Sequence, residues 1–178
     1  PGESVNIVSP TLEIEGTLTA TDRAYVEAAR GLGLHDFMLS YVERAEDVEE
    51  VRALDPQARV VLKIESVRGI DLAHSARATL GRLMAARGDL YVEVLQPHRV
   101  LAALRELIQA DPEAIAASRI LTSLAFGDVP EEQDITDVAY LLSLGYRTLM
   151  LGDEVCLRRD SVLAALNLLE AIAGEVRP

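Results

Sequence analysis

The chain has 178 residues, 49% of them hydrophobic, with a formal net charge of −12, which suits one domain with a sizeable core. The acidic balance argues against a nucleic-acid partner or an anionic-membrane surface, and no apolar run is long enough to cross a bilayer. A single cysteine, Cys156, excludes an intrachain disulfide framework and a multi-cysteine zinc site, so we expect a cytoplasmic protein.

The predicted elements alternate along most of the chain. Residues 1–18 contain two prolines and two glycines and are predicted to form a linker with an extended piece, followed by one partial domain over residues 19–178. Short apolar runs predict strands at residues 34–40, 59–65, 82–86, 120–124 and 148–151. Helical spacing predicts helices at residues 21–32, 46–54, 100–110, 134–144 and 161–173, and residues 70–79 fit a short helix less clearly.

Strands that alternate with helices predict parallel βα units in an α/β fold. Two architectures remain open: a five-stranded doubly wound sheet, and a piece of a (β/α)8 TIM-type barrel. Polar residues follow the predicted strands, and a barrel gathers such strand ends around one mouth. Neither a G-x-G-x-x-G fingerprint nor a P-loop follows any strand. The pattern favours the barrel slightly.

Lys63 is the only lysine in the chain, because the other sixteen basic residues are all arginine. Arginine stays protonated in proteins, whereas a lysine can exchange a proton when its surroundings lower its pKa. Lys63 ends a predicted buried strand and lies two residues from Glu65, so both side chains share one face. The pattern indicates a site that uses a compact ammonium; the alternative is a simple ion pair at a strand end.

Further polar residues follow neighbouring predicted strands. The carboxylates of Glu65 and Asp89 would converge there, and oxygen ligands of this kind suit Mg²⁺ or Mn²⁺. The turn at Gly88 offers backbone N–H groups to an anion, and Thr122 offers a hydroxyl. Ser40 and Thr122 have little weight alone, and Asp89 also fits a turn or helix cap. Together they stand at the ends of different predicted strands.

Several stretches of the chain resemble the pyruvate kinase family, in the same order. They are Phe37-Met38-Leu39-Ser40-Tyr41-Val42, Lys63-Ile64-Glu65-Ser66, Ala86-Arg87-Gly88-Asp89-Leu90, Asp137-Val138-Ala139 and Leu149-Met150-Leu151. The second and third are the specific ones. The resemblance implies a (β/α)8 barrel of which this chain supplies strands four to eight. The family's first three strands, lid domain and C-terminal regulatory domain have no counterpart here.

The resemblance also implies a reaction, in which phosphoenolpyruvate and ADP give pyruvate and ATP. Glu65 and Asp89 would hold Mg²⁺ or Mn²⁺, and Lys63 would stabilise the phosphoryl group and the enolate. Thr122, Ser40 and the backbone from Gly88 to Asp89 would bind the substrate, and Thr122 would also act at the reacting end as a catalytic residue. Potassium is a further cofactor of the family, but its ligands are not in this chain.

The chain departs from the family pattern at several positions. The arginine after the family's Ser-Phe-Val stretch is Glu43 here, and Tyr91 replaces a glycine. The family's Thr-Gln pair is matched with Thr122-Ser123. Its Pro-Thr-Arg-Ala-Glu stretch becomes residues 130–134 and loses its cation, and its Ser-Gly-Glu-Thr stretch becomes residues 152–155. These changes affect nucleotide handling and subunit contacts but spare the metal and enolate groups.

Two other functions stay open on the sequence. One is a metal-dependent lyase or aldolase that acts on a 2-oxo acid, since the same lysine and carboxylates can stabilise a pyruvate enolate without a nucleotide. The other is a non-catalytic binding or regulatory module. In each case a half barrel exposes apolar strand edges, so we expect a homo-oligomer, a partner chain or a further segment that completes the barrel.

Overall fold

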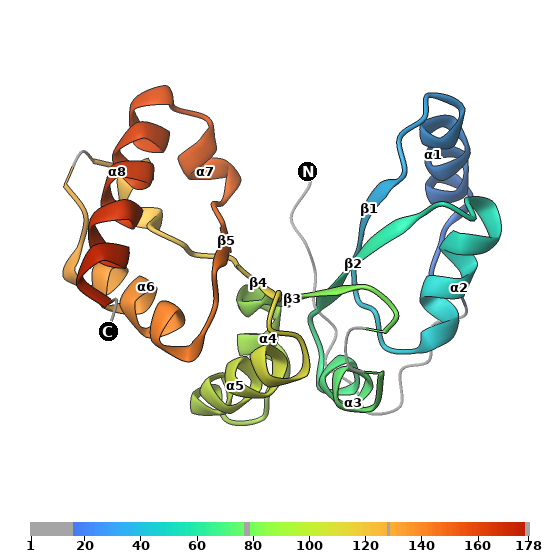
Figure 1. Ribbon diagram of the computed structural model, residues 1–178, viewed down its shortest axis with the longest axis horizontal. Helices are drawn as coiled ribbons and strands as arrows, with labels where there is room; N and C mark the ends of the chain where they lie inside the picture. The colour runs from blue at the N-terminus through green and yellow to red at the C-terminus, as the bar shows by residue number, and fades with distance from the viewer. Residues whose placement is uncertain (1–15, 77–78, 128, 177–178) are drawn as a thin grey trace.

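The computed structural model describes residues 16–76, 79–127 and 129–176. Its centre is one sheet of five parallel strands that follow each other in chain order (Figure 1). The strands are β1 (Asp36–Leu39), β2 (Arg59–Ile64), β3 (Arg82–Ala86), β4 (Ile115–Ala117) and β5 (Thr148–Met150). The predicted α/β class with five parallel βα units is confirmed, whereas the predicted linker over residues 1–18 falls mostly outside the described residues.

Helices connect the strands and cover one face of the sheet. They are α1 (Ala20–Gly31), α2 (Ala45–Leu54), α3 (Val67–Ala76), α4 (Arg87–Glu93), α5 (Val100–Ala110), α6 (Glu132–Leu144), α7 (Asp153–Cys156) and α8 (Arg159–Val176), with 3₁₀ turns η1 (Pro97–Arg99) and η2 (Thr122–Ala125). None of the helices in the described part is long and apolar enough to span a membrane.

The two faces of the sheet differ in burial, because successive strand residues point to opposite sides. Val60, Leu62 and Ile64 of β2 are at most 3% exposed and belong to the core under the helices. Between them Val61 and Lys63 point to the other face and are partly exposed. This second face corresponds to the inside of a barrel.

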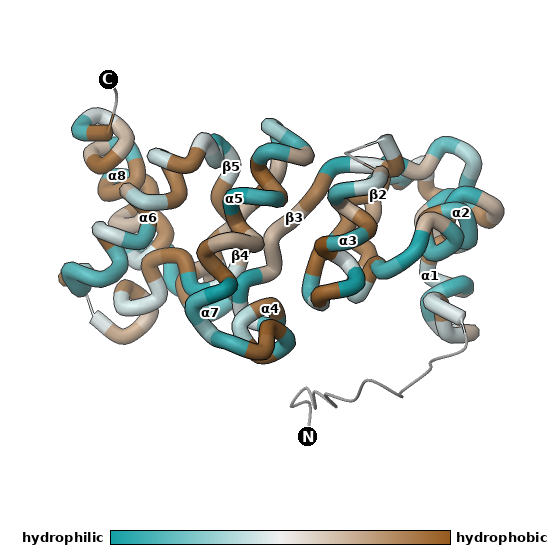
Figure 2. The backbone as a smooth tube through the Cα atoms, turned by 90° about the horizontal axis from the view of Figure 1, so that it is seen from below, coloured by the Kyte–Doolittle hydropathy of each residue, from teal (hydrophilic) through white to brown (hydrophobic). Residues whose placement is uncertain are grey.

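The sheet does not close on itself within the described residues. The strand order starts at β1 and ends at β5, and these two strands are not paired with each other. Figure 2 shows the consequence: α1 and α2 lie at one end of an elongated molecule and α6 and α8 at the other, with β3 and β4 between them. The chain therefore forms an open arc of a barrel.

One predicted strand is wrong. Residues 120–124 are apolar, but the strand of this unit is β4, which ends at Ala117. Leu121 has φ 53 and ψ 37, a left-handed conformation that a strand does not adopt, and η2 follows it. Ile120, Leu121 and Leu124 are buried as core residues of a turn. Burial, rather than strand pairing, accounts for this apolar run.

Candidate active site

Lys63 lies at the carboxyl end of β2, between a hydroxyl and a carboxylate. Its Nζ is 2.8 Å from Oε1 of Glu65 and 3.1 Å from Oγ of Ser40, which directly follows β1. The Glu65 side chain is 2% exposed and that of Lys63 is 25% exposed. A buried carboxylate requires charged or hydrogen-bonding partners, because desolvation otherwise disfavours its ionised form. Lys63 supplies one such partner and still reaches solvent.

Tyr41 connects Glu65 to the second predicted carboxylate. Its backbone N–H donates to Oε2 of Glu65 at 2.6 Å, and its hydroxyl donates to Oδ1 of Asp89 at 3.4 Å. The structure therefore brings together four of the predicted residues, Ser40, Lys63, Glu65 and Asp89, at the ends of β1, β2 and β3. Tyr41 was not predicted as part of this group.

The charges around Tyr41 are mostly negative. Partial burial, together with the nearby charges of Asp89, Glu65 and Glu93, raises the pKa of the Tyr41 phenol to about 12, so the hydroxyl keeps its proton at neutral pH. Burial and the charges of Glu43 and Asp89 also raise the pKa of Glu93. Such an accumulation of carboxylates favours the binding of a cation.

Arg87 fixes the turn that carries Asp89. Its guanidinium contacts both carboxylate oxygens of Asp137 on α6, at 2.6 and 2.8 Å, and donates to the carbonyl of Ser118 at 2.6 Å. The side chain is only 12% exposed. A planar guanidinium that binds two separate elements in this way holds them at a defined spacing. The first turn of α4, with Gly88 and Asp89, is thereby tied to the end of β4.

Ser118 takes the position at the end of β4 that we had predicted for Thr122. A Cβ atom placed on Gly88 would lie 3.5 Å from the Ser118 hydroxyl oxygen, so the hydroxyl adjoins the Gly88–Asp89 turn. Sequence reasoning missed Ser118 because it placed the strand five residues too late. The available signal was the short run Ile115-Ala116-Ala117, which has the small apolar residues of a buried strand.

Thr122 lies further along, at the start of η2. Its hydroxyl is buried, and among the described residues it is the only buried side-chain oxygen or nitrogen without a hydrogen-bond partner. Such a group costs free energy unless another molecule satisfies it. The structure neither joins Thr122 to Lys63 and the carboxylates by a direct contact nor gives its hydroxyl another role.

Strained backbone marks the same edge of the sheet. The non-glycine residues with positive φ in the described ranges are Tyr41, Ser118, Arg119 and Leu121, with φ between 51° and 70°. They follow β1 and β4, the strands that flank β2 and β3. Residues other than glycine adopt this backbone conformation at a cost in free energy, and such residues concentrate at functional sites.

The departures from the family pattern have local partners. Glu43 accepts a hydrogen bond from the Ser66 hydroxyl at 2.6 Å and lies 3.6 Å from Arg68. Asp134 accepts from the backbone N–H of Ser123 at 3.1 Å, which ties the first turn of α6 to η2. These contacts stabilise the loops around the site, while Glu132 remains exposed.

The carboxylates fit a divalent cation only together with other ligands. No group of three or more His, Cys, Asp or Glu side chains in the described ranges is arranged to hold a metal ion. Glu65 uses each oxygen once, toward Lys63 and toward the Tyr41 N–H, which leaves further lone pairs free. Two carboxylates with water and substrate oxygens match the coordination that Mg²⁺ prefers.

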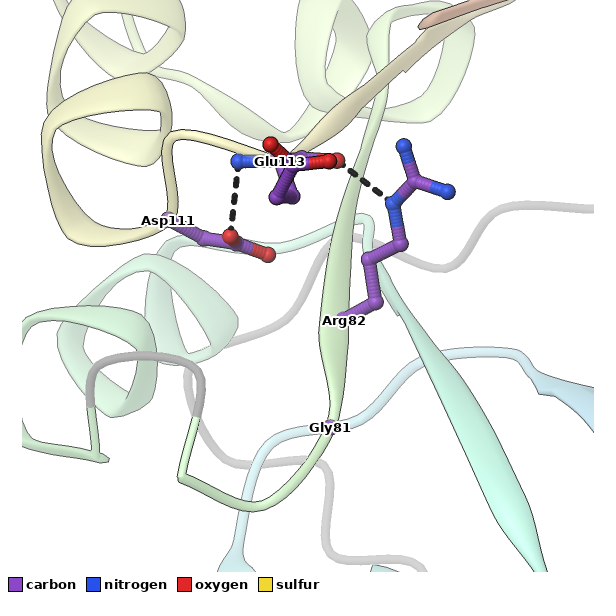
Figure 3. A pocket seen from close by; sticks show the side chains of 4 residues that line it. All are labelled: Gly81, Arg82, Asp111 and Glu113. Carbon is purple, nitrogen blue, oxygen red and sulfur yellow. Dashed lines mark hydrogen bonds between the residues drawn. The ribbon is translucent and has the colours of Figure 1, made fainter.

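An open hollow lies at the opposite, amino-terminal edge of the sheet (Figure 3). It is lined by Gly81, Arg82, Asp111 and Glu113. Arg82 donates to the Glu113 carbonyl and to the Thr148 hydroxyl, and Asp111 accepts from the backbone N–H groups of Leu83 and Glu113 at 2.8 and 2.9 Å. Arg82 and Asp111 thereby link the starts of β3, β4 and β5.

Five parallel βα units with a lysine and two carboxylates at their carboxyl ends define a segment of a (β/α)8-type barrel. The comparison with known families agrees: the model described as "Pyruvate kinase, barrel domain" matches residues 2–157. The chain belongs to the pyruvate kinase family.

Individual relatives are similar at about 30% identity. A pyruvate kinase of Thermoplasma acidophilum is 30% identical over 174 residues, which cover 93% of this chain and 32% of the relative. A pyruvate kinase of Agrobacterium vitis is 33% identical over 157 residues, which cover 85% of this chain and 32% of the relative. Pyruvate kinase 2 of Saccharomyces cerevisiae is 28% identical over 179 residues, which cover 96% of this chain and 35% of the relative. The chain thus spans about a third of the length of the relatives it matches.

Proposed function

We propose that this chain carries the metal and enolate site of a pyruvate kinase-type phosphotransferase, which converts phosphoenolpyruvate and ADP to pyruvate and ATP. One observation carries the proposal: Lys63, Glu65 and Asp89 converge at one edge of the sheet, linked through Ser40 and Tyr41. Family membership supports the same reaction. Residues 19–178 act in this proposal as one part of the barrel domain.

The residues have separate tasks in the proposed reaction. Glu65 and Asp89 hold Mg²⁺ or Mn²⁺, which when bound neutralises negative charge on the substrate. Lys63 places its ammonium beside the phosphoryl group during transfer and beside the enolate that remains. Ser40 orients that ammonium through its hydroxyl. Phosphoryl transfer depends mainly on positioning and on neutralisation of charge, which these groups supply.

The substrate carboxylate is assigned to the turn at Gly88 and Asp89. Backbone N–H groups at the start of α4 are suitable anion donors. The Ser118 hydroxyl adjoins this turn and is the nearer candidate for a further hydrogen bond. Thr122, the residue predicted from the sequence, is the second candidate because its buried hydroxyl has no partner in the described residues.

The remaining assignments follow from the family. Phosphoenolpyruvate, pyruvate, ADP and ATP are the proposed small-molecule partners, and the cytoplasm is the proposed location. Potassium would require ligands from outside this chain. The rest of the barrel is supplied by a further segment, a partner chain or a second copy.

A metal-dependent lyase or aldolase acting on a 2-oxo acid is the second candidate. The observation in its favour is the segment of residues 130–134, where Glu132 stands in place of the family's arginine and is exposed on α6. An anionic nucleotide gains nothing from a carboxylate at this position. Enolate chemistry at Lys63, Glu65 and Asp89 does not depend on it.

Binding of Mn²⁺ with and without oxalate, a planar mimic of the pyruvate enolate, tests the proposal. The chain is first shown to melt cooperatively, and Mn²⁺ affinity is then measured by titration calorimetry. We expect oxalate to strengthen Mn²⁺ binding. The Asp89→Ala variant should lose Mn²⁺ binding, while its melting temperature changes little. The matched control is Asp153→Ala, which removes an exposed carboxylate at the start of α7.

The two candidate reactions are then separated by one assay. ATP formation from phosphoenolpyruvate and ADP supports the phosphotransferase, whereas oxalate-enhanced Mn²⁺ binding without ATP formation favours the lyase. A cooperatively folded chain that binds no Mn²⁺ contradicts both and supports a non-catalytic module.

A further inference from the structure

We propose that Tyr41 is a positioning residue of the carboxylate pair, whose hydroxyl orients Asp89 for the metal while its backbone N–H orients Glu65. This inference rests on the proposed metal site and extends it to a residue outside the Lys63, Glu65 and Asp89 set. It concerns the phenol hydroxyl in particular, which a phenylalanine at this position lacks.

The geometry places one residue between two carboxylates from different strands. The N–H of Tyr41 is 2.6 Å from Oε2 of Glu65, and its hydroxyl is 3.4 Å from Oδ1 of Asp89. The backbone of Tyr41 has φ 51, and this left-handed conformation turns the chain after β1. Ser40, the preceding residue, accepts from Lys63. Residues 40 and 41 thus contact all three charged groups of the site.

The hydroxyl contacts Asp89, the less buried of the two carboxylates. Glu65 is buried and held from two sides, whereas Asp89 lies on the first turn of a seven-residue helix and is partly exposed. A hydrogen bond to one oxygen of a ligating carboxylate leaves the other oxygen available and restricts the rotation of the side chain. Groups that orient metal ligands in this way commonly change metal affinity by about 10- to 100-fold.

The sequence shows which substitution isolates the hydroxyl. The resembling stretch of the family reads Ser-Phe-Val, whereas this chain has Ser40-Tyr41-Val42. Tyr41→Phe therefore keeps an aromatic ring that this loop accommodates, and it keeps the N–H that holds Glu65. Of the two contacts that Tyr41 makes to the carboxylates, the substitution removes the one between the hydroxyl and Asp89. A loss of metal affinity in this variant cannot be attributed to the ring or to the backbone.

The experiment compares Mn²⁺ affinities of the full chain by titration calorimetry, together with melting temperatures. We expect Tyr41→Phe to weaken Mn²⁺ binding by about tenfold, the lower end of the usual range because the contact is long. Its melting temperature should stay close to that of the unmodified chain. The matched control is Tyr91→Phe, which removes the hydroxyl of a tyrosine on α4 whose ring faces Arg119 and should leave the Mn²⁺ affinity unchanged.

The outcomes separate this inference from the proposed function. Unchanged Mn²⁺ affinity in Tyr41→Phe, in a chain where Asp89→Ala abolishes binding, overturns the role of Tyr41 and leaves the metal site intact. An equal loss in Tyr41→Phe and Tyr91→Phe also overturns it, because the effect is then not specific to the hydroxyl beside Asp89. A folded, unmodified chain without Mn²⁺ binding removes the metal site and this inference together.

Discussion

At the scale of single residues, the buried Thr122 hydroxyl leads to a prediction about the free energy of unfolding. Its oxygen is buried without a partner in the described residues, and a buried polar group of this kind costs about 1–3 kcal/mol. Thr122→Val keeps the shape of the side chain and removes the hydroxyl. We therefore expect a higher free energy of unfolding by about 1 kcal/mol, measured by urea denaturation without ligands.

A neighbouring hydroxyl provides the control. Ser161 is buried, and its Oγ donates to the Leu124 carbonyl of η2 at 2.8 Å, so Ser161→Ala should lower stability where Thr122→Val raises it. A loss of stability in Thr122→Val would mean that the hydroxyl is already satisfied in solution. Oxalate affinity in the presence of Mn²⁺, compared between Thr122→Val and Ser118→Ala, then shows which hydroxyl contacts the substrate carboxylate.

These residues also show how far the sequence predicts the site. Lys63 and Glu65 were predictable because residues two apart on a strand share a face. Asp89 was predictable because β2 and β3 are adjacent and parallel. Tyr41 and Ser118 were not, since their positions depend on where β1 and β4 end and on positive φ angles. Local backbone conformation of this kind leaves little trace in residue type.

At the scale of elements, Asp47 determines where α2 begins. Its carboxylate is 3% exposed and accepts from the backbone N–H groups of Glu43 and Arg44, at 2.9 and 3.0 Å, and from the Thr17 hydroxyl. This satisfies N–H groups that the start of a helix otherwise leaves without partners. The segment before α2 follows the Ser40–Tyr41 turn, so the same contacts help to hold one side of the candidate site.

Asp47→Asn should lower the free energy of unfolding at pH 7 by about 1.5–3 kcal/mol, the range for hydrogen bonds to a charged group. The amide keeps one acceptor oxygen but turns an NH₂ donor toward groups that are themselves donors. Chemical denaturation measures the difference. The control is Glu46→Gln, which removes an exposed carboxylate from the same helical turn and should change stability by less than about 0.5 kcal/mol.

The effect of Asp47 depends on pH in a defined direction. Burial alone would raise the pKa of Asp47, but hydrogen bonds from Thr17, Glu43 and Arg44 outweigh it, so the pKa in the folded chain is lowered from 3.8. The stabilising contribution of the Asp47 carboxylate is complete at pH values above its pKa in the unfolded chain. It is lost as the pH falls through the lowered pKa of the folded chain. The stability difference between the unmodified chain and Asp47→Asn should therefore stay constant from pH 7 to 5 and shrink in more acid solution. A difference that stays undiminished as the pH falls from 5 to 2 would contradict this account.

Element boundaries explain most of the differences between prediction and structure. The strands flanked by polar turns, β1, β2 and β3, were placed well because their apolar runs are isolated in the sequence. The unit with β4 was misplaced because two apolar runs follow each other, and only the shorter one pairs with neighbouring strands. The α4 helix was read as a turn, since a glycine in its first turn weakens the helical pattern.

At the scale of the whole molecule, the open sheet determines how the chain behaves alone. The inner face runs across registered residues of all five strands: Met38 pairs with Val61, Met84 with Ile115, and Ile115 with Thr148. Met38 of the edge strand is 60% exposed. The relatives are about three times as long as this chain. An exposed edge strand with an apolar side chain is a site of association.

We therefore expect the isolated chain to self-associate with increasing concentration, through the edge at β1 and the inner face. Met38→Lys places a charge on this edge, and a lysine there opposes strand pairing. Sedimentation velocity over a range of concentrations should show a dissociation constant raised by about tenfold or more, since a loss of about 1.4 kcal/mol of association energy corresponds to tenfold.

Leu32→Lys is the control for this experiment, because Leu32 is 78% exposed at the end of α1 and lies outside the sheet. It adds the same charge to the same acidic chain, so any general effect of net charge appears in both variants. A chain that stays monomeric at every concentration would contradict the prediction and would show that the open edge is protected. Equal weakening by both substitutions would place the contact elsewhere. Only a selective effect of Met38→Lys assigns the association to the side of the sheet that a complete barrel encloses.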